Sequence, residues 1–300
     1  MITSANPRGV YRNGYKPGCL PRKSKPGEWC PMAAERIKII PSVDWDEAAK
    51  ELGDSVRQHV PVVLDQNGYR SCACESATGA VMLARAIAGL PFVLLNPLFV
   101  YHTTSGGRDN GSSIDENLAF IREHGIAPES VWPRSKGFQA KPSTLAIEAA
   151  KEFRIEEFFD IANVNEMVSS ELTGYAVVYG ADGHSVLKIQ HLSAKEGLDL
   201  NSWKNSNWGD GGFGVWATYN SVDFSYGAWA VRVASSPQSI LRPLVSTVGT
   251  TLPTPEESRA YCLSRCPDIA NAPWMFLRDG SKLAMNIEVL LKSAKLEAPQ

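Results

Sequence analysis

Hydrophobic positions in the first half of the chain follow a helical period, most clearly over residues 72–88. The small and apolar residues of this segment stand at 77, 80, 81, 84, 87 and 88. This spacing places them on one face of a helix, and Gly89 predicts its end. Residues 46–56 and 113–124 read as shorter helices, so we expect the first lobe of the protein to be helical.

The pattern changes after residue 156, where β-branched and aromatic residues gather in short runs separated by Gly or Asp. These runs span 175–179, 185–190, 213–218 and 228–233. Runs of this kind predict strands. Helices followed by antiparallel strands predict an α+β domain of two lobes, with a cleft between them.

Composition divides the chain into three parts. Residues 1–40 hold eight Lys or Arg against two acidic residues, with frequent Pro and Gly. This is typical of an extended arm, which is either a surface segment or a propeptide. Residues 41–235 carry the predicted elements and form the core domain. Residues 236–300 contain a linker and predicted helices near 254 and 283–296, and both the arm and this extension are candidates for contacts in a protein assembly.

The totals of the chain limit its partners and its compartment. With 300 residues, of which 44% are hydrophobic, the chain can bury a sizeable core. A formal charge of −2 gives no reason to expect nucleic acid as a partner. Residues 1–18 contain no apolar run of the kind a secretory leader has, so no leader is expected, and no run reaches the ~18 apolar residues that crossing a membrane requires. We therefore expect a soluble, cytoplasmic protein.

Cysteine usage agrees with that expectation. Six cysteines in 300 residues are too few for a disulfide-stapled secreted domain and favour a reducing compartment. The four that could meet as zinc ligands are Cys19, Cys30, Cys262 and Cys266. The gap between the first two is unusual for a zinc site. Unpaired thiols are the simpler interpretation, and no metal or cofactor is expected.

Cys72 stands where a polar, glycine-containing loop over residues 65–71 becomes the helix of residues 72–88. Unsatisfied N–H groups and the macrodipole at a helix N-terminus favour a thiolate there. The same N–H groups can bind an oxyanion. Cys72 is therefore a candidate nucleophile. A cysteine beside small residues in a buried helix is also a common packing residue, and that is the role expected of Cys74.

The loop resembles that of the papain-like cysteine peptidases, which have a Gln six residues before the nucleophile. Gln66 and Cys72 have this spacing, and the resemblance implies that Gln66 donates its side-chain amide to the oxyanion hole. Three further segments resemble the family in order and distance: 95–101, 110–113 and 123–133. The second of them implies that Gly111 and Ser112 line the substrate cleft. The resemblance as a whole implies a papain-like fold of two lobes.

The resemblance also assigns a base and a residue that orients it. His184 begins an apolar strand and follows Cys72 in the family's order, so it is the expected base among five histidines. Residues 203–214 resemble the family's Lys-Asn-Ser-Trp-Gly signature, which puts Asn205 in the orienting position. The family's Trp after Asn-Ser is missing at this alignment. Trp208 is therefore expected to shield the His184–Asn205 hydrogen bond and to contribute to the substrate site.

These residues predict acyl transfer through a thioester at Cys72, with peptides or proteins as substrates. Two departures from the family pattern bear on catalytic efficiency: Ala73 stands where the family has Trp, and the Trp after the Asn-Ser pair is missing. Tyr69 stands where the family has a Cys, and the loss of that disulfide agrees with a reducing compartment. One alternative is therefore an idle papain-like domain that acts as a structural or binding module. Another is an acyltransferase that uses the same triad.

Overall fold

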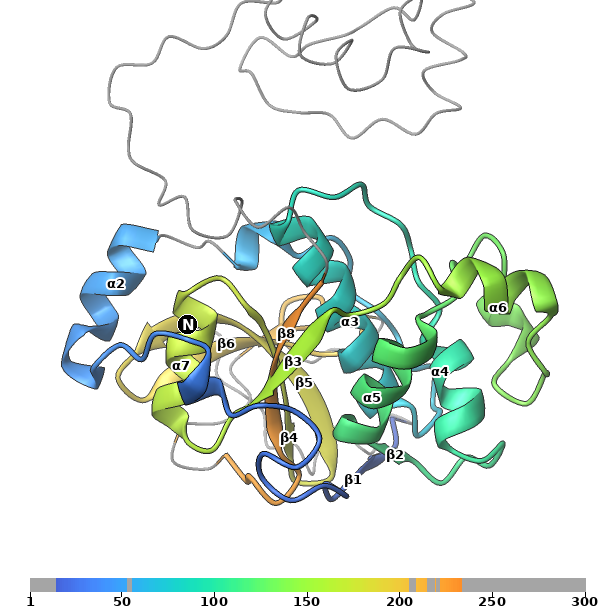
Figure 1. Cartoon of the computed structure of the whole chain (residues 1–300), viewed down its shortest axis with the longest axis horizontal. Coiled ribbons are helices and arrows are strands. Elements are labelled where there is room, and N and C mark those ends of the chain that lie inside the picture. Colours follow the sequence, from blue (N-terminus) through green and yellow to red (C-terminus); the bar gives the residue numbers. More distant parts are fainter. Residues whose placement is uncertain (1–14, 53–55, 205–208, 215–218, 220–221, 234–300) are drawn as a thin grey trace, which may run out of the picture. The chain divides into compact units, whose positions relative to one another are not determined.

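A computed structural model describes residues 15–52, 56–204, 209–214, 219 and 222–233 (Figure 1). These residues all belong to one unit of the chain, which we describe by itself. The predicted extension over residues 236–300 lies outside the described residues, so it stays a prediction.

The helical lobe is built around α3 (Cys72–Ile87), whose first 13 residues are all buried. Three helices complete this lobe: α4 (Pro97–Thr104), α5 (Ile114–His124) and α6 (Thr144–Ala150). The start of α4 is fixed by Asn96, whose side chain accepts a hydrogen bond from the N–H of Leu98. The helices predicted over residues 72–88 and 113–124 are thus present, and the one predicted over 46–56 corresponds to α2 (Trp45–Leu52).

The second lobe contains an antiparallel sheet of six strands in the order β3-β8-β4-β5-β6-β7. The strands are β3 (Glu157–Asp160), β4 (Ala176–Ala181), β5 (His184–Ser193), β6 (Glu196–Leu200), β7 (Phe213–Gly214) and β8 (Ala228–Arg232). Strands β4, β5, β7 and β8 fall in the four predicted runs, and residues 215–218 of the third run lie outside the described residues. Both β3 and β6 were not predicted, and neither was helix α7 (Val164–Leu172).

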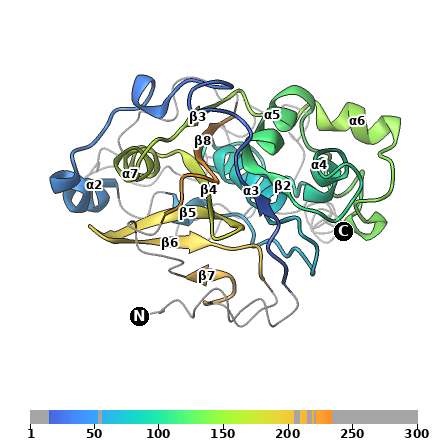
Figure 2. The same ribbon diagram turned by 90° about the horizontal axis from the view of Figure 1, so that it is seen from below.

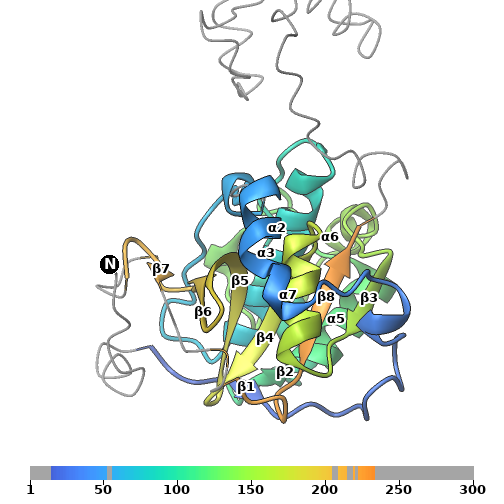
Figure 3. The same ribbon diagram turned by 90° about the vertical axis from the view of Figure 1, so that its left-hand side faces the viewer.

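Helices cover both faces of this sheet (Figure 2). Along β4, Val178 faces the core that includes α3, whereas Val177 and Tyr179 face the core that includes α7. This alternation follows from the two-residue period of a strand. Figure 3 views the molecule from the side that α2 and α7 cover. The sheet is therefore a buried wall against which the nucleophile helix packs.

A close approach brings α3 onto the sheet. Gly79 lies in the middle of α3, and a Cβ at this position would lie 2.9 Å from the side chain of Leu187 in β5. The missing side chain allows helix and strand to pack closely enough to set Cys72, at the start of α3, beside the start of β5.

The N-terminal arm enters the fold as a strand. The two-residue strand β1 (Cys19–Leu20) pairs in parallel with β2 (Ser112–Ser113), beside α3 (Figure 2). Single turns of 3-10 helix cover Ala33–Glu35, Ser42–Asp44, Arg57–His59 and Arg134–Lys136. In the described part of the chain, no helix combines the length and the hydropathy that a membrane span requires.

Candidate active site

Cys72 is the first residue of α3, and its side chain is fully buried. The loop before it turns sharply at Asn67 and Gly68, whose φ angles are 48° and 77°. Glycine and asparagine are the residues that tolerate this left-handed conformation. The turn brings the side chain of Gln66 within hydrogen-bond distance of the Tyr69 carbonyl, three residues before Cys72.

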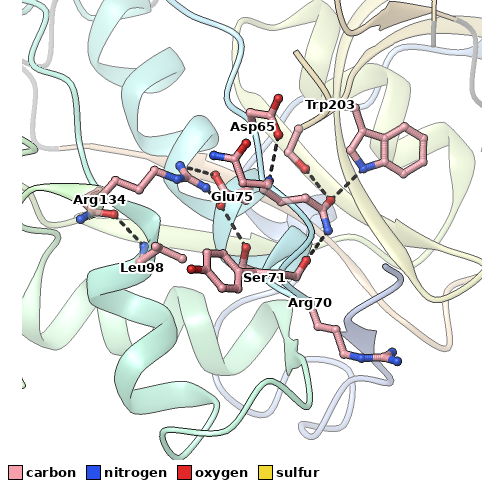
Figure 4. A network of polar contacts seen from close by, with 12 residues as sticks. Asp65, Arg70, Ser71, Glu75, Leu98, Arg134 and Trp203 are labelled. Carbon is pink, nitrogen blue, oxygen red and sulfur yellow. Dashed lines mark hydrogen bonds and ion pairs between the residues drawn. The ribbon is translucent and has the colours of Figure 1, made fainter. Parts of the chain in front are cut away.

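The orientation of the Gln66 amide is fixed by its partners, which include Trp203, labelled in Figure 4. Its Oε1 accepts hydrogen bonds from the indole N–H of Trp203 at 2.8 Å and from the hydroxyl of Ser202 at 3.1 Å. Because two donors face the oxygen, the Nε2 donors must point the other way. Nε2 donates to the carbonyl oxygens of Tyr69 at 2.6 Å and Lys16 at 3.0 Å. Gln66 therefore presents an N–H donor to a backbone carbonyl.

His184 begins β5 directly after a tight turn. Asp182 and Gly183 both have positive φ, 51° and 77°, and they join Ala181 of β4 to His184 of β5. Two-residue hairpins favour this conformation because its twist matches that of the strands. The turn therefore fixes the position of the His184 side chain at the start of β5.

The imidazole is held by Asn201. The His184 Nε2 atom lies 2.7 Å from the Oδ1 atom of Asn201, and both residues are buried. The indole of Trp203 covers the imidazole, with ring centroids 4.5 Å apart and an angle of 30° between the planes. An amide oxygen can only accept, so Nε2 carries the hydrogen of this bond.

Asn201 thus has the contact that the sequence analysis expected of Asn205. Asn205 and Trp208 lie outside the described residues, and their predicted roles stay untested. The signal that could have identified Asn201 is the run Asn201-Ser202-Trp203, an Asn-Ser pair followed directly by Trp and placed four residues before Asn205. In this register the family's Trp is present, as Trp203.

The nucleophile helix and the strand of the base are in contact at this point. The hydroxyls of Ser76 in α3 and Ser185 in β5 lie 2.5 Å apart. Backbone hydrogen bonds from Gly18, Ser185 and Ala73 reach the Cys72 sulfur, where they lower the pKa of the thiol. Cys72 therefore lies against the strand position that directly follows His184.

Burial dominates the electrostatics of the pair. Desolvation is the largest effect on Cys72 and raises the pKa of its thiol to about 12 despite those hydrogen bonds. Desolvation also lowers the pKa of His184 to about 4, against the hydrogen bond with Asn201, which raises it. In the conformation described, the two groups are a neutral thiol and a neutral imidazole at pH 7.

Cys74 has the packing role expected of it. Its thiol donates to Asn117 Oδ1 at 3.2 Å and lies 3.4 Å from the hydroxyl of Ser112. The Asn117 amide in turn donates to the Ser112 hydroxyl at 3.0 Å. These contacts fix the segment that follows Gly111.

Gly111 and Ser112 lie on one side of the cleft, and the N-terminal arm of the chain occupies that cleft. The N–H of Ser112 donates to the carbonyl oxygen of Gly18 at 2.9 Å. A Cβ on Gly111 would overlap that same carbonyl. On the other side, the Gly183 carbonyl accepts hydrogen bonds from the N–H groups of Gly18 at 3.1 Å and Cys19 at 2.9 Å. The arm therefore lies where the resemblance places a substrate. The sequence analysis left open whether the arm is a surface segment or a propeptide.

The predicted zinc alternative is not tested. Cys19 and Cys30 are free, buried thiols, and Cys262 and Cys266 lie outside the described residues. Among the residues that the structure describes, no group of three or more His, Cys, Asp or Glu is arranged to hold a metal ion.

Solved structures with the same architecture are cysteine proteases. Xylellain, a cysteine protease from Xylella fastidiosa, matches with a TM-score of 0.53 at 18% identity, over 74% of this chain and 96% of its own. The proform of Amb a 11, a cysteine protease of ragweed pollen, gives 0.56 at 16% over 76% and 78%. Stem bromelain precursor gives 0.51 at 16% over 76% and 86%. Comparisons with protein-family models and with curated proteins found no match.

The similarity covers most of this chain and most of each of these proteins. It agrees with the helical first lobe and the antiparallel second lobe. The fold class predicted from the sequence is confirmed: this chain has the two-lobed α+β fold of the papain-like cysteine proteases.

Proposed function

We propose that this protein is a cysteine peptidase that hydrolyses peptide bonds through a thioester on Cys72. The observation that carries the proposal is the shielded hydrogen bond between His184 and Asn201. The residue after His184, Ser185, reaches the Cys72 sulfur with a backbone hydrogen bond. A buried imidazole that is oriented by an amide and lies next to a cysteine at a helix start is the arrangement that activates a thiol.

Each residue has one role in the proposed reaction. Asn201 holds the hydrogen on Nε2 of His184, so Nδ1 is the nitrogen whose lone pair takes the thiol proton. The Cys72 thiolate then attacks the substrate carbonyl. The Nε2 donor of Gln66 and the N–H of Cys72 stabilise the oxyanion. His184 returns the proton to the leaving amine, and water hydrolyses the thioester.

The orienting role is tested by two matched variants. Asn201→Ala removes the hydrogen bond to His184, and we expect kcat/KM on a mixed peptide library to fall about 10- to 100-fold with the fold retained. Asn205→Ala serves as the control, with an expected change below about threefold. Cys72→Ala sets the background of the assay. A larger loss with Asn205→Ala than with Asn201→Ala would return the orienting role to Asn205.

Peptides or proteins are the proposed substrates, since the cleft already accepts an extended backbone through its carbonyl and N–H groups. We place the enzyme in a reducing, cytoplasmic compartment, and its low cysteine density supports that placement.

One observation favours a second candidate function. The cleft is filled by the protein's own arm, as it would be in a structural or binding module with an idle site. Iodoacetamide labelling separates the two functions. A peptidase must expose Cys72 under some condition in which it also cleaves peptides, whereas an idle module has no such condition.

A further inference from the structure

Asp109 lies at the edge of the candidate active site, in the loop between α4 and β2. Its Oδ1 atom accepts hydrogen bonds from the N–H of Arg70 at 2.7 Å and from the hydroxyl of Tyr101 at 2.9 Å. Arg70 stands two residues before Cys72, and the fully buried Tyr101 belongs to α4. The carboxylate is therefore attached to the loop that leads to the nucleophile.

The same hydrogen bonds place Asp109 beside the cleft. The Tyr101 hydroxyl, which donates to Asp109, also accepts a hydrogen bond from the N–H of Gly111 at 3.0 Å. A phenolic hydroxyl can do both, because it has one donor and also accepts. Gly111 lies on one side of the cleft, so the position of Asp109 is fixed relative to the cleft wall as well as to Cys72.

The second oxygen of the carboxylate faces a cation. Asp109 Oδ2 lies 4.0 Å from the ammonium nitrogen of Lys16. The Asp109 side chain is 28% exposed and that of Lys16 is 52% exposed, so both charges are in partial contact with solvent. A carboxylate that is held through one oxygen and is partly open at the other is suited to attract a positively charged side chain.

The backbone of Lys16 shows which substrate residue would present that side chain. The Lys16 carbonyl oxygen accepts the hydrogen bond from Gln66 Nε2 at 3.0 Å. In the proposed reaction this donor binds the oxygen of the carbonyl that Cys72 attacks. One residue thus places its carbonyl on Gln66 and its ammonium near Asp109. A substrate residue whose carbonyl takes the same donor has Asp109 within reach of its side chain.

A second charged side chain at this edge contacts a different part of the bound chain. The guanidinium of Arg70 donates to the main-chain carbonyl of Pro17 at 2.9 Å, whereas it is the backbone N–H of Arg70 that bonds to Asp109. Arg70 therefore binds main chain, and Asp109 faces a side chain. Because the guanidinium is nearby, it reduces the attraction of this edge for a cation without reversing it.

We propose that Asp109 determines the specificity of the site: it selects peptides in which the residue on the amino side of the scissile bond is Lys or Arg. This inference rests on the proposed function and names its substrate class. Ion pairs that solvent reaches are weak. We therefore expect kcat/KM for Lys at this position to exceed that for an uncharged side chain of similar length by about three- to fivefold.

The matched test compares Asp109→Asn with the wild type in the full chain. Asparagine keeps an oxygen that accepts from Arg70 and Tyr101, but it removes the charge. Two peptides that differ only in Lys or Met before the scissile bond report the preference as a ratio of kcat/KM. We expect Asp109→Asn to bring this ratio to about one. Asp44→Asn removes an exposed charge from the turn before α2 and should keep the wild-type ratio.

Salt gives a readout that a purely structural role of Asp109 would not change. Because salt screens charges that solvent reaches, about 0.5 M NaCl should lower the Lys to Met ratio of the wild type toward one. The ratio of Asp109→Asn should not respond. If Asp109→Asn instead lowers kcat/KM equally on both peptides and keeps the wild-type ratio, the carboxylate only supports the loop and the proposal is wrong. A wild-type preference for Glu over Lys would assign the selection to Arg70 and is equally against it.

Peptidyl chloromethyl ketones separate this inference from the proposed function. The Cys72 sulfur bonds to the methylene carbon of the probe, chloride leaves with the bonding electrons, and the thiol proton passes to solvent, so no hydrolysis is needed. Faster labelling by a probe ending in Lys than by one ending in Met, without cleavage of any peptide, retains the role of Asp109 and overturns the peptidase. Equal labelling by both probes, with equal cleavage of both peptides, overturns the role of Asp109 and retains the peptidase.

Discussion

At the scale of single residues, Trp203 links the two halves of the candidate site. Its ring covers His184, and its N–H holds the oxygen of Gln66. One side chain thus shields the base and turns the amide donor of Gln66 toward the cleft. The same residue explains why the orienting amide is at Asn201, since only in this register does an aromatic ring follow the Asn-Ser pair directly.

Trp203→Phe keeps a ring over His184 but removes the N–H that Gln66 accepts. We expect kcat to fall roughly tenfold, because the Gln66 oxygen then keeps the Ser202 hydroxyl but loses its shorter hydrogen bond, and its N–H is held less firmly toward the oxyanion. Stability should fall by about 1 kcal/mol through the lost hydrogen bond. Trp132→Phe is the control, a buried Trp outside the site that should cost stability without lowering kcat. Equal kcat for both variants contradicts the linking role.

The burial of His184 predicts how stability depends on pH. Its pKa is lowered to about 4 in the fold, against about 6.5 in the unfolded chain. Between these values the unfolded chain binds the proton more readily, so stability falls as the pH drops from about 6.5 to 4, by roughly 3 kcal/mol at pH 4 from this residue.

Denaturant unfolding of His184→Gln at a series of pH values tests this dependence. The acid-side slope between pH 6.5 and 4 should be shallower than in the wild type. His124→Gln, an exposed histidine on α5, should leave the slope unchanged. Parallel slopes for wild type and His184→Gln would show that the imidazole is protonated in the folded protein.

Much of the site could be predicted at residue scale, but not all of it. A fixed offset in one loop and the family resemblance predicted Gln66 and Cys72, and the family's order of motifs predicted His184; their catalytic roles stay predictions. Asn201 was missed because two Asn-Ser pairs lie four residues apart, and the packing of Trp203 distinguishes them. The contact between Lys16 and Gln66 joins residues 50 positions apart. No periodicity or local motif predicts such a contact.

At the scale of elements, the first turn of α3 is tied to the loop that follows α5. Glu75 is fully buried, accepts a hydrogen bond from the Ser71 hydroxyl at 3.0 Å and pairs with the guanidinium of Arg134 (Figure 4). The Arg134 N–H is held by Glu129 at 2.6 Å. This ion pair fixes the residue directly before the nucleophile.

Arg134→Gln leaves the Glu75 carboxylate buried without its cation. We expect a loss of about 3–5 kcal/mol in the free energy of unfolding, because an uncompensated buried charge is costly. The double variant Glu75→Gln/Arg134→Gln should recover part of this loss. Lys151→Ala breaks an exposed ion pair with Glu148 and should change stability by less than about 0.5 kcal/mol. Denaturant titration of the four proteins is the measurement, and equal losses for Arg134→Gln and Lys151→Ala would contradict the role of the pair.

The predicted elements were those with the clearest period. Residues 72–87 form α3, in which Gly79 lies against the sheet, and each of the four apolar runs contains a strand within its described residues. Helix α7 was missed although it has a start signal, since Asn163 caps it and bonds to Glu166. Strand β6 contains Glu196, Gly197 and Asp199, which have low strand propensity. Pairing with β5 determines its conformation.

At the scale of the whole described unit, the arm joins the lobes across the cleft. The sheet lobe supplies Asp160 and Gly183, and the helical lobe supplies Asp115 and Ser112. Residues 15–24 are therefore a structural part of the domain, although their composition is typical of an extended arm. Composition predicts that such a segment is extended, but its place depends on acceptors distributed over two lobes.

The covalent attachment of the arm to the domain has a consequence for dilution. While the chain is intact, residues 16–20 stay near the cleft at a millimolar-scale effective concentration, however dilute the protein is. A single nick at the exposed residues Leu20 and Pro21 would turn this segment into a free peptide whose occupancy of the cleft depends on its concentration in solution. The rest of the arm would stay attached through the contacts of Arg22 with Asp160 and of Ser24 with Asp115.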